Sequence, residues 1–493
     1  MSSDAVQKQL LPPVSATGRT LGLTGLCLGT ALIIMEANVI NVAIPAIRTD
    51  LHASQTGALW AVDAYTLVFA ALLLSAGRLG DRIGARRGYL TGLGLFAVAS
   101  IACSFAPSTG MLVLGRVCQG LGAALLAPAP LTLITRTFTA TAERTRAVSV
   151  WVSMGGIGFM IGPFIGGLLV DTLGWRSIFL LNVPVAVATG WLVARNVKEV
   201  PLQRVSFDIR GQAIAIVGLA ATAWALVESS VAGWLDPVVL AALVGGIVAL
   251  IVFVAAQFSW ARHGRQVLLP PAIIAARPVL AGLLGGATYN FSLYGMLIVY
   301  TFNFQQLRSY SAFQTGLAFL PLTVAATLVS TFLSTRFITK FGPRTGLATG
   351  MTLSAIGLVL LTVASAPYWL VAVGFCVFSF GMGLSAPAQT LAVMTFAPDQ
   401  HKNMGSSALN TARQTGGMIG VALLGAIVTT DPVSGTPIAI AIAIGTCMIA
   451  AATALRLIPR ETIRTDTSQR PGHHSRERIP GGGEEGDEQM PRQ

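Results

Sequence analysis

The sequence predicts an all-α integral membrane protein with fourteen transmembrane helices, and three observations support this prediction. Of its 493 residues, 53% are hydrophobic and only 11% are charged, with a mean hydropathy of +0.70. Soluble domains carry about 25% charged residues. The apolar residues gather in runs long enough to span a bilayer, which takes about 20 residues. Basic residues lie between these runs at alternate breaks.

Fourteen apolar runs, separated by charged or Pro/Gly-rich breaks, are the predicted membrane spans. Backbone polar groups must pair within a segment in lipid, so each run is predicted to be helical. The runs cover residues 20–46, 58–77, 89–106, 110–134, 147–171, 175–195, 210–230, 237–258, 278–303, 312–335, 345–365, 368–395, 405–430 and 435–456.

The basic residues predict the orientation of the chain. With a cytoplasmic N-terminus, the inward breaks carry eighteen Lys or Arg residues and the outward ends carry three, as expected because cytoplasmic loops are enriched in Lys and Arg. We therefore expect both termini in the cytoplasm. The inward residues are Arg78, Arg82, Arg86, Arg87, Arg136, Arg144, Arg146, Arg195, Lys198, Arg204, Arg210, Arg262, Arg265, Arg277, Arg336, Lys340, Arg344 and Lys402, and the outward ones are Arg48, Arg176 and Arg308.

The composition also excludes several classes of function. The net charge of +12 does not indicate nucleic-acid binding, because the Arg residues sit between apolar segments and face anionic lipid. Five cysteines lie in apolar segments without paired spacing, so no disulfide or metal site is predicted. No Ser–His, paired-Asp or nucleotide-binding pattern predicts an enzyme or ATP coupling. We expect no cofactor.

Three ionisable residues inside predicted spans form the candidate functional core. Glu36, Asp63 and Arg116 all fall in the outer half of the membrane by the assigned directions. A charge in hydrocarbon is costly and normally marks an ion or substrate pathway. A buried carboxylate can exchange a proton when a neighbouring charge changes its affinity, and a guanidinium is a permanent neighbour of this kind. We predict that these residues couple transport to protons, although Asp63 could instead counter a cationic substrate.

Glycine-rich segments predict the conformational gate. Residues 77–87 read GRLGDRIGARR, in which glycines permit a tight turn and Asp81 could accept from the amino end of the predicted 405–430 helix. Residues 158–167 read GFMIGPFIGG, in which glycines admit a neighbouring backbone and Pro163 weakens the helix. The predicted gate residues are Gly77, Asp81, Arg82, Gly84, Arg86, Gly158, Gly162, Pro163, Gly166 and Gly167.

An internal repeat predicts two related halves. A shift of 258 residues superimposes four positions of the 77–87 segment on a second segment. The pairs are Arg78 with Arg336, Arg82 with Lys340, Gly84 with Gly342, and Arg86 with Arg344.

These segments resemble the major facilitator superfamily, specifically its fourteen-helix drug:proton antiporters, over residues 20–458. The segment 35–45 (MEANVINVAIP) is similar to the family signature D-x-T-I-V-N-V-A-L-P, with Glu36 in place of Asp and Asn38 in place of Thr. The segments 77–87, 116–122 (RVCQGLG), 158–167 and 175–184 (WRSIFLLNVP) resemble further family motifs. Within the family, the chain resembles actinomycete antibiotic-resistance exporters of the methylenomycin and puromycin type.

The resemblance implies a major facilitator fold, with two six-helix halves and two inserted central helices. We expect an N-terminal half at 20–200, the insert with its linkers at 201–277 and a C-terminal half at 278–458. Cytoplasmic tails are expected at 1–19 and 459–493, the second one disordered. Candidate substrate-binding residues are Asn41, Trp60, Tyr65, Asn182, Asn290, Tyr294 and Arg413, although Arg413 could instead brace the loop latch.

The expected function is proton-coupled export of an amphipathic drug or antibiotic by alternating access, with the proton gradient as energy source. Two alternatives remain on the same fold: a lipid or lipophilic-metabolite exporter, and a proton-coupled nutrient symporter. The expected partners are a small amphipathic molecule, protons and membrane lipid, with no nucleic acid. We expect a monomer that crosses the bacterial inner membrane many times.

Overall fold

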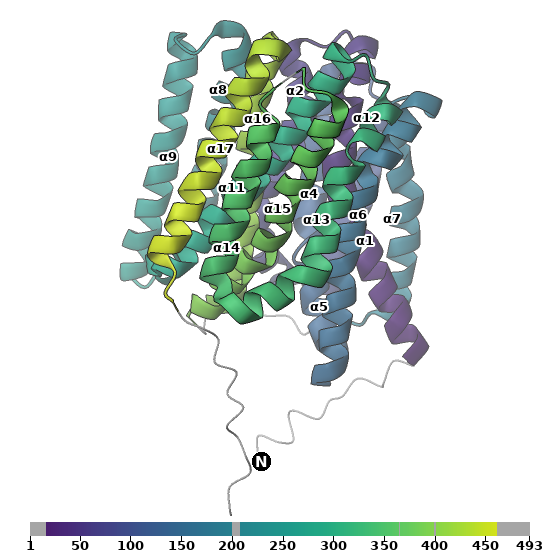
Figure 1. Ribbon diagram of the computed structural model, residues 1–493. Helices are drawn as coiled ribbons and strands as arrows, with labels where there is room; N and C mark the ends of the chain where they lie inside the picture. Colours follow the sequence, from purple (N-terminus) through teal and green to yellow (C-terminus); the bar gives the residue numbers. More distant parts are fainter. Residues whose placement is uncertain (1–15, 200–207, 364, 399–400, 461–493) are drawn as a thin grey trace, which may run out of the picture.

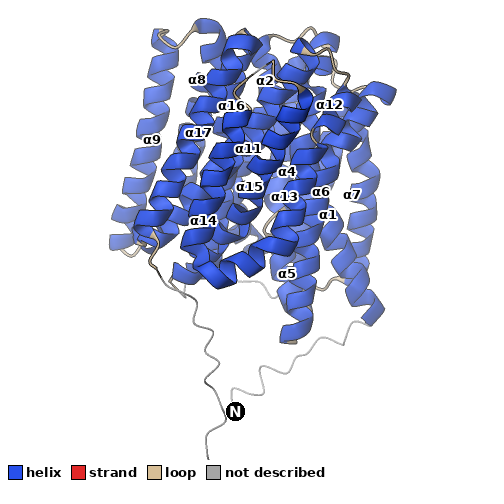
Figure 2. Cartoon of the chain, in the orientation of Figure 1, coloured by secondary structure: helices blue, strands red, loops and turns tan. Residues whose placement is uncertain are grey.

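The computed structural model describes residues 16–460 except for 200–207, 364 and 399–400. The described residues form a bundle of long helices that run in roughly the same direction, joined by short loops (Figures 1 and 2). The helices are α1 (Ala16–Asp50), α2 (Gln55–Ile83), α3 (Ala85–Ser104), α4 (Thr109–Leu126), α5 (Ala129–Thr137), α6 (Thr141–Leu173), α7 (Arg176–Asn196), α8 (Ile209–Ala232), α9 (Pro237–Arg262), α10 (Pro271–Ala275), α11 (Arg277–Phe302), α12 (Ala312–Ala318), α13 (Leu320–Leu328), α14 (Ser334–Leu360), α15 (Tyr368–Phe396), α16 (Lys402–Thr430) and α17 (Pro432–Leu457), with short π-helical segments η2 (Asn303–Leu307) and η3 (Val329–Leu333).

Each predicted apolar run contains helix, with two departures from a single continuous span. The run at 110–134 is divided into α4 and α5 at Ala127–Pro128, since proline cannot donate the helical hydrogen bond. The run at 312–335 contains α12, α13 and η3. Ten described segments are long and apolar enough to cross a membrane, and one of them, Ala312–Leu360, holds two predicted runs. The predicted runs outside these ten are α3, α11 and α16.

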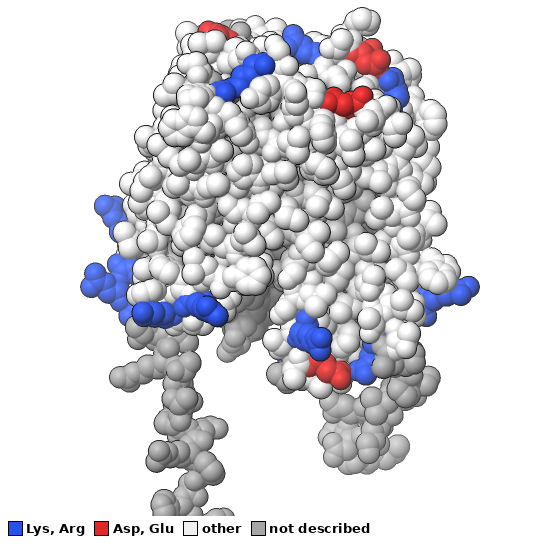
Figure 3. Space-filling view, turned by 45° about the vertical axis from the view of Figure 1, so that its right-hand side comes forward, with Lys and Arg blue, Asp and Glu red and all other residues white. Residues whose placement is uncertain are grey.

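The first described helix begins, and the last one ends, at the same end of the bundle. α1 begins and α17 ends at the lower end in Figure 1, which is called the near end below; the opposite end is the far end. Figure 3 shows Lys, Arg, Asp and Glu near the two ends of the drawn face, with a wide uncharged belt between them. Such a belt fits a hydrocarbon layer, because charged side chains are costly there.

The repeated segments adopt the same backbone break in both halves. Gly84 separates α2 from α3 at φ 102°, and Gly342 interrupts α14 at φ 78°, where residues with a Cβ are rarely found. The matched arginines that follow also make similar hydrogen bonds. Arg86 donates to the carbonyl of Ala194, and Arg344 donates to that of Leu455, 2.5 Å away.

The two helices between the halves lie on one flank of the bundle. α8 packs against α2 and α16, while α9 lies outside α8 (Figure 1). α9 exposes a large set of apolar side chains, as a lipid-facing helix would. They include Val238, Leu240, Val244, Ile247, Val248, Ile251 and Val252.

Candidate functional site

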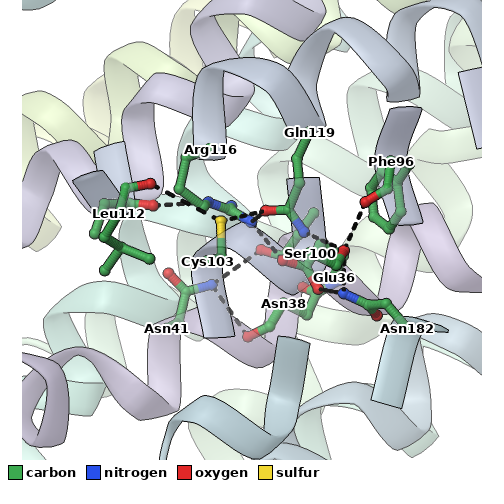
Figure 4. A network of polar contacts seen from close by, with 12 residues as sticks. Glu36, Asn38, Asn41, Phe96, Ser100, Cys103, Leu112, Arg116, Gln119 and Asn182 are labelled. Atoms are coloured by element: carbon green, nitrogen blue, oxygen red, sulfur yellow. Dashed lines mark hydrogen bonds and ion pairs between the residues drawn. The ribbon is translucent and has the colours of Figure 1, made fainter. Parts of the chain in front are cut away.

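Glu36 of α1 and Arg116 of α4 form an ion pair in the interior of the bundle (Figure 4). Neither side chain has accessible surface. Glu36 Oε1 accepts a hydrogen bond from Arg116 Nη1, and Glu36 Oε2 accepts one from Asn182 Nδ2 of α7 at 2.8 Å. The carboxylate is therefore held by one charged and one neutral donor from two other helices.

Further contacts fix the Arg116 guanidinium. Its Nε donates to the carbonyl of Ala61 at 2.8 Å, and its Nη1 also donates to Gln119 Oε1 at 2.9 Å. The guanidinium carbon lies 4.5 Å from the centre of the Tyr65 ring. A buried ion pair needs such additional bonds, because desolvation can exceed the attraction between the charges.

A ring of polar side chains closes around this pair. Gln119 Nε2 donates to Ser100 Oγ at 2.7 Å, and Asn182 Nδ2 approaches the same oxygen at 3.2 Å. The thiol of Cys103 lies 3.6 Å from Gln119 Oε1. Gln119 belongs to the 116–122 motif, whereas Ser100 and Cys103 were not predicted. A polar Ser100 within the apolar run 89–106 was the available signal.

Asp63 lies apart from the ion pair. Its side chain is fully buried, yet its nearest hydrogen-bonding partner is Thr66, 3.5 Å from Oδ1. Oδ2 has no partner, and none of the ion pairs among the described residues includes Asp63. Of the three predicted proton-coupling residues, the structure thus brings Glu36 and Arg116 together and leaves Asp63 separate.

Two asparagines of α1 lie on the same stretch as Glu36. Asn41 and Asn38 are buried, and their Nδ2 atoms donate to α1 carbonyls at 3.2 Å and 2.5 Å respectively. The Oδ1 atoms of both residues are buried without a partner. They are acceptors available to a bound molecule or water. Trp60, near the beginning of α2, is half-buried and packs against apolar residues of both halves.

The C-terminal half contributes a second polar group, on α11, α15 and α16. Arg413 Nη2 donates to the carbonyl of Ala386 at 3.1 Å and to Thr390 Oγ1 at 3.0 Å. Asn290 is 3.4 Å from Gln414, and Tyr294 packs against the apolar cluster of the N-terminal half. Among the described residues, Arg413 makes these bonds to α15 and none to residues 77–87.

The predicted gate glycines of α6 face two different helices. A Cβ on Gly158 would lie 2.7 Å from the Ala31 carbonyl of α1, and one on Gly162 would lie 3.2 Å from Asn38 Cβ. A Cβ on Gly167 would lie 2.8 Å from Phe313 Cα of α12. α6 therefore packs closely against its own half and, at the far end, against the other half.

The 77–87 segment ends α2 and begins α3, with Gly84 at the break. The side chain of Asp81 lies outside the described part of the structure, so its predicted latch stays a prediction. Glu199, which was not predicted, accepts from the backbone amides of Arg86 and Arg87 at 3.0 Å each. Its carboxylate thus caps the amino end of α3, which has no cap of its own.

Comparisons with known proteins identify the family of the chain. Residues 26–337 and 322–478 match the family model described as Major Facilitator Superfamily. The chain belongs to this superfamily. Major facilitator proteins are transporters, so the chain is a multi-pass membrane transporter and not an enzyme. The structure holds no cluster of potential metal ligands among the residues it describes.

Several superfamily relatives are resistance proteins. The Methylenomycin A resistance protein of Streptomyces coelicolor is 34% identical over 90% of this chain and 93% of its own length. That of Bacillus subtilis is 33% identical over 84% and 88%. The Puromycin resistance protein of Streptomyces alboniger is 32% identical over 91% and 93%. A crystal structure of a POT family transporter in complex with a thioalcohol-conjugated peptide shares the fold, with a TM-score of 0.66 at 14% identity over 90% of this chain and 97% of that one.

Proposed function

We propose that this major facilitator protein is a proton-coupled antiporter that exports an amphipathic drug or antibiotic by alternating access. The observation that carries the proposal is the fully buried Glu36, whose charged partner is the permanently charged Arg116. A buried carboxylate of this kind can take up and release a proton as its surroundings change. The resistance proteins that resemble the chain over most of its length support export of a toxic compound.

The ion pair supplies a switch between two states. When Glu36 is ionised, it holds Arg116 of α4 and Asn182 of α7 against α1. Protonation removes the charge and weakens both bonds, because hydrogen bonds to ionised groups are about twice as strong as neutral ones. Protonation would then favour a different packing of these helices. Proton release would restore the present one.

The sidedness follows from charges and contacts. The basic residues predicted to face inward support a cytoplasmic near end, in the inner membrane of a bacterium. At the far end, Asp171 of α6 accepts from the backbone amides of Ala312 and Phe313 in the other half, at 3.2 and 2.9 Å. Gln305 also donates to the Val42 carbonyl at 3.0 Å. These contacts support a state closed to the outside.

Proton movement in inverted membrane vesicles tests the proposal. Acidified vesicles containing the wild type should lose protons when a suitable antibiotic is added, and Glu36→Gln should abolish this response. Glu228→Gln, a carboxylate change on α8, is the matched control and should leave it intact. If the response survives in Glu36→Gln, the coupling role passes to Asp63. If no compound moves protons while uptake or lipid transfer is detectable, the antiporter proposal is wrong.

A further inference from the structure

Arg413 lies near the middle of α16 and has no counter-ion. Among the described residues, the ion pairs join other groups, and no carboxylate lies within ion-pair distance of Arg413. One of its nitrogens, Nη2, makes both of its hydrogen bonds, to Ala386 and Thr390. Its Nε is buried without an acceptor. The guanidinium therefore keeps a full charge and donors that the protein does not use.

The contrast with Arg116 shows what is missing. Arg116 is paired with Glu36 and bonds to Ala61 and Gln119 as well. Arginine stays protonated in proteins, so Arg413 cannot escape the cost of an unpaired charge by losing a proton. An intramembrane charge without a partner is costly and marks a functional position. The described residues supply no anion here, and the transported molecule is a natural source of one.

A second unsatisfied group lies beside Arg413. Gln389 of α15 has no accessible surface, and both ends of its amide lack a partner. Gly286 of α11 packs closely against both: a Cβ at this position would lie 2.6 Å from Leu409 Cδ1, 2.9 Å from Gln389 Oε1 and 3.3 Å from Arg413 Cγ. The backbone of Gly286 therefore lies against both the Gln389 amide and the stem of Arg413, which places the two side chains next to each other. A planar anion could accept from Arg413 and from the Gln389 amide there.

Aromatic rings adjoin the same place. The Arg413 guanidinium carbon lies 5.9 Å from the centre of the Tyr289 ring, and both Tyr289 and Tyr294 are half-buried. Apolar surfaces with a few polar groups are typical of sites for small organic molecules. The rings could hold the apolar body of a molecule whose charged end lies at Arg413.

We infer that Arg413 and Gln389 bind a carboxylate, or a comparable anionic group, of the exported molecule. The transporter would then select amphipathic anions over cations. This inference rests on the proposed export function and names its substrate class. A purely structural role for Arg413, as a brace between α15 and α16, predicts that removing it weakens binding of all molecules alike.

Direct binding to the purified full-length protein tests the inference. The probes are 4-phenylbutyrate, longer ω-phenyl carboxylates, and the amide and amine of each. We expect the wild type to bind the carboxylates at least tenfold more tightly than their amides and amines. Arg413→Gln should abolish this preference, and Arg413→Lys should keep part of it because the charge remains. Arg262→Gln, at the exposed near end of α9, should leave the preference unchanged.

The outcomes separate the inference from the proposed function. Equal or absent binding of carboxylates by the wild type, or a preference that survives in a folded Arg413→Gln protein, would overturn the inference. Proton movement in inverted membrane vesicles that contain the wild type is measured independently. If it is driven by cations or neutral compounds alone, export stands and the anion site fails. If carboxylates bind selectively but never move protons, the anion site stands and proton-coupled export fails.

Discussion

At the scale of single residues, the two halves of this transporter differ in whether their buried charges are paired. The N-terminal half holds a compensated pair, in which Glu36 balances the charge of Arg116 and each residue also bonds to a neutral side chain. The C-terminal half holds the uncompensated Arg413. An ion pair can separate when its carboxylate is protonated, whereas an unpaired cation can bind an anion. On the proposed function, the two halves would supply separate groups for the proton and for the cargo.

The compensated pair makes a prediction about stability. Arg116→Gln should destabilise the protein by about 3–5 kcal/mol, because it leaves the buried Glu36 charge unpaired. The double change Glu36→Gln with Arg116→Gln should be less harmful than Arg116→Gln alone, since no buried charge remains. Thermal unfolding in detergent measures both. A double variant at least as unstable as Arg116→Gln would show that the pair is not electrostatically coupled.

The residue scale also shows what the sequence could reveal about the site. Glu36 and Arg116 were predictable because a charge within an apolar run is conspicuous. Their hydrogen bonds to Asn182, Ala61 and Gln119 were not, since they depend on how four helices rotate against one another. The same limit applies to Gln389, a neutral amide that stands out only once its lack of partners is known.

At the scale of elements, α6 is one of the helices through which the two halves meet at the far end. Its glycines accept α1 on one side and α12 on the other. Asp171, two residues before its end, caps the amino end of α12. On the proposed alternating-access function, this contact would have to open and close as a unit.

A substitution at Gly167 tests the close packing of α6 against α12. Gly167→Leu should abolish transport, because a side chain there meets α12 and overpacking costs about 1–3 kcal/mol. Gly245→Leu in α9 is the matched control, since a Cβ at Gly245 meets nothing within 4 Å. Export by proteoliposomes measures both. Equal activity of the two variants would exclude the α6–α12 contact as a working part of the gate.

A substitution at Asp171 tests its role as a cap on the amino end of α12. Asp171→Ala should weaken far-end closure, because replacing a capping side chain by Ala costs about 0.5–2 kcal/mol and this exposed carboxylate belongs at the low end. The ratio of closed to open molecules should fall by about 3-fold. Spin labels at Thr172 and Ser434, on exposed far-end positions of the two halves, report the distance between them. An unchanged distance distribution would contradict the cap's role.

The positions of the helices were the part of the fold that the sequence predicted best. Long apolar runs can only be helices in lipid, so the fourteen runs could be located directly. The break at Ala127–Pro128 and the π-helical segments η2 and η3 could not, because hydropathy does not register a local change in hydrogen bonding. The repeat of Gly84 at Gly342 was an exception, since a glycine within a repeated motif signals a special backbone angle.

At the scale of the whole molecule, the inserted helices are attached unequally to the two halves. Gln212 of α8 donates to the Ala71 carbonyl of α2 at 2.7 Å and accepts from Ser75. Towards α16, α8 presents an apolar surface in which Leu219 and Ala223 cluster with Met418. Hydrogen bonds have a fixed geometry, whereas apolar contacts permit sliding. We therefore expect α8 and α9 to move with the N-terminal half while α16 slides past them.

Cross-linking on either side of α8 tests this division. In a protein whose native cysteines are replaced, a bismaleimide bridge between Ser75→Cys and Gln212→Cys should leave export intact, since both residues belong to the same moving body. A bridge between Ala223→Cys and Met418→Cys should block export, because it ties α8 to the half that moves past it. Each double variant without the reagent is its own control. If the first bridge blocks export and the second does not, α8 moves with the C-terminal half, and the apolar surface is its anchor.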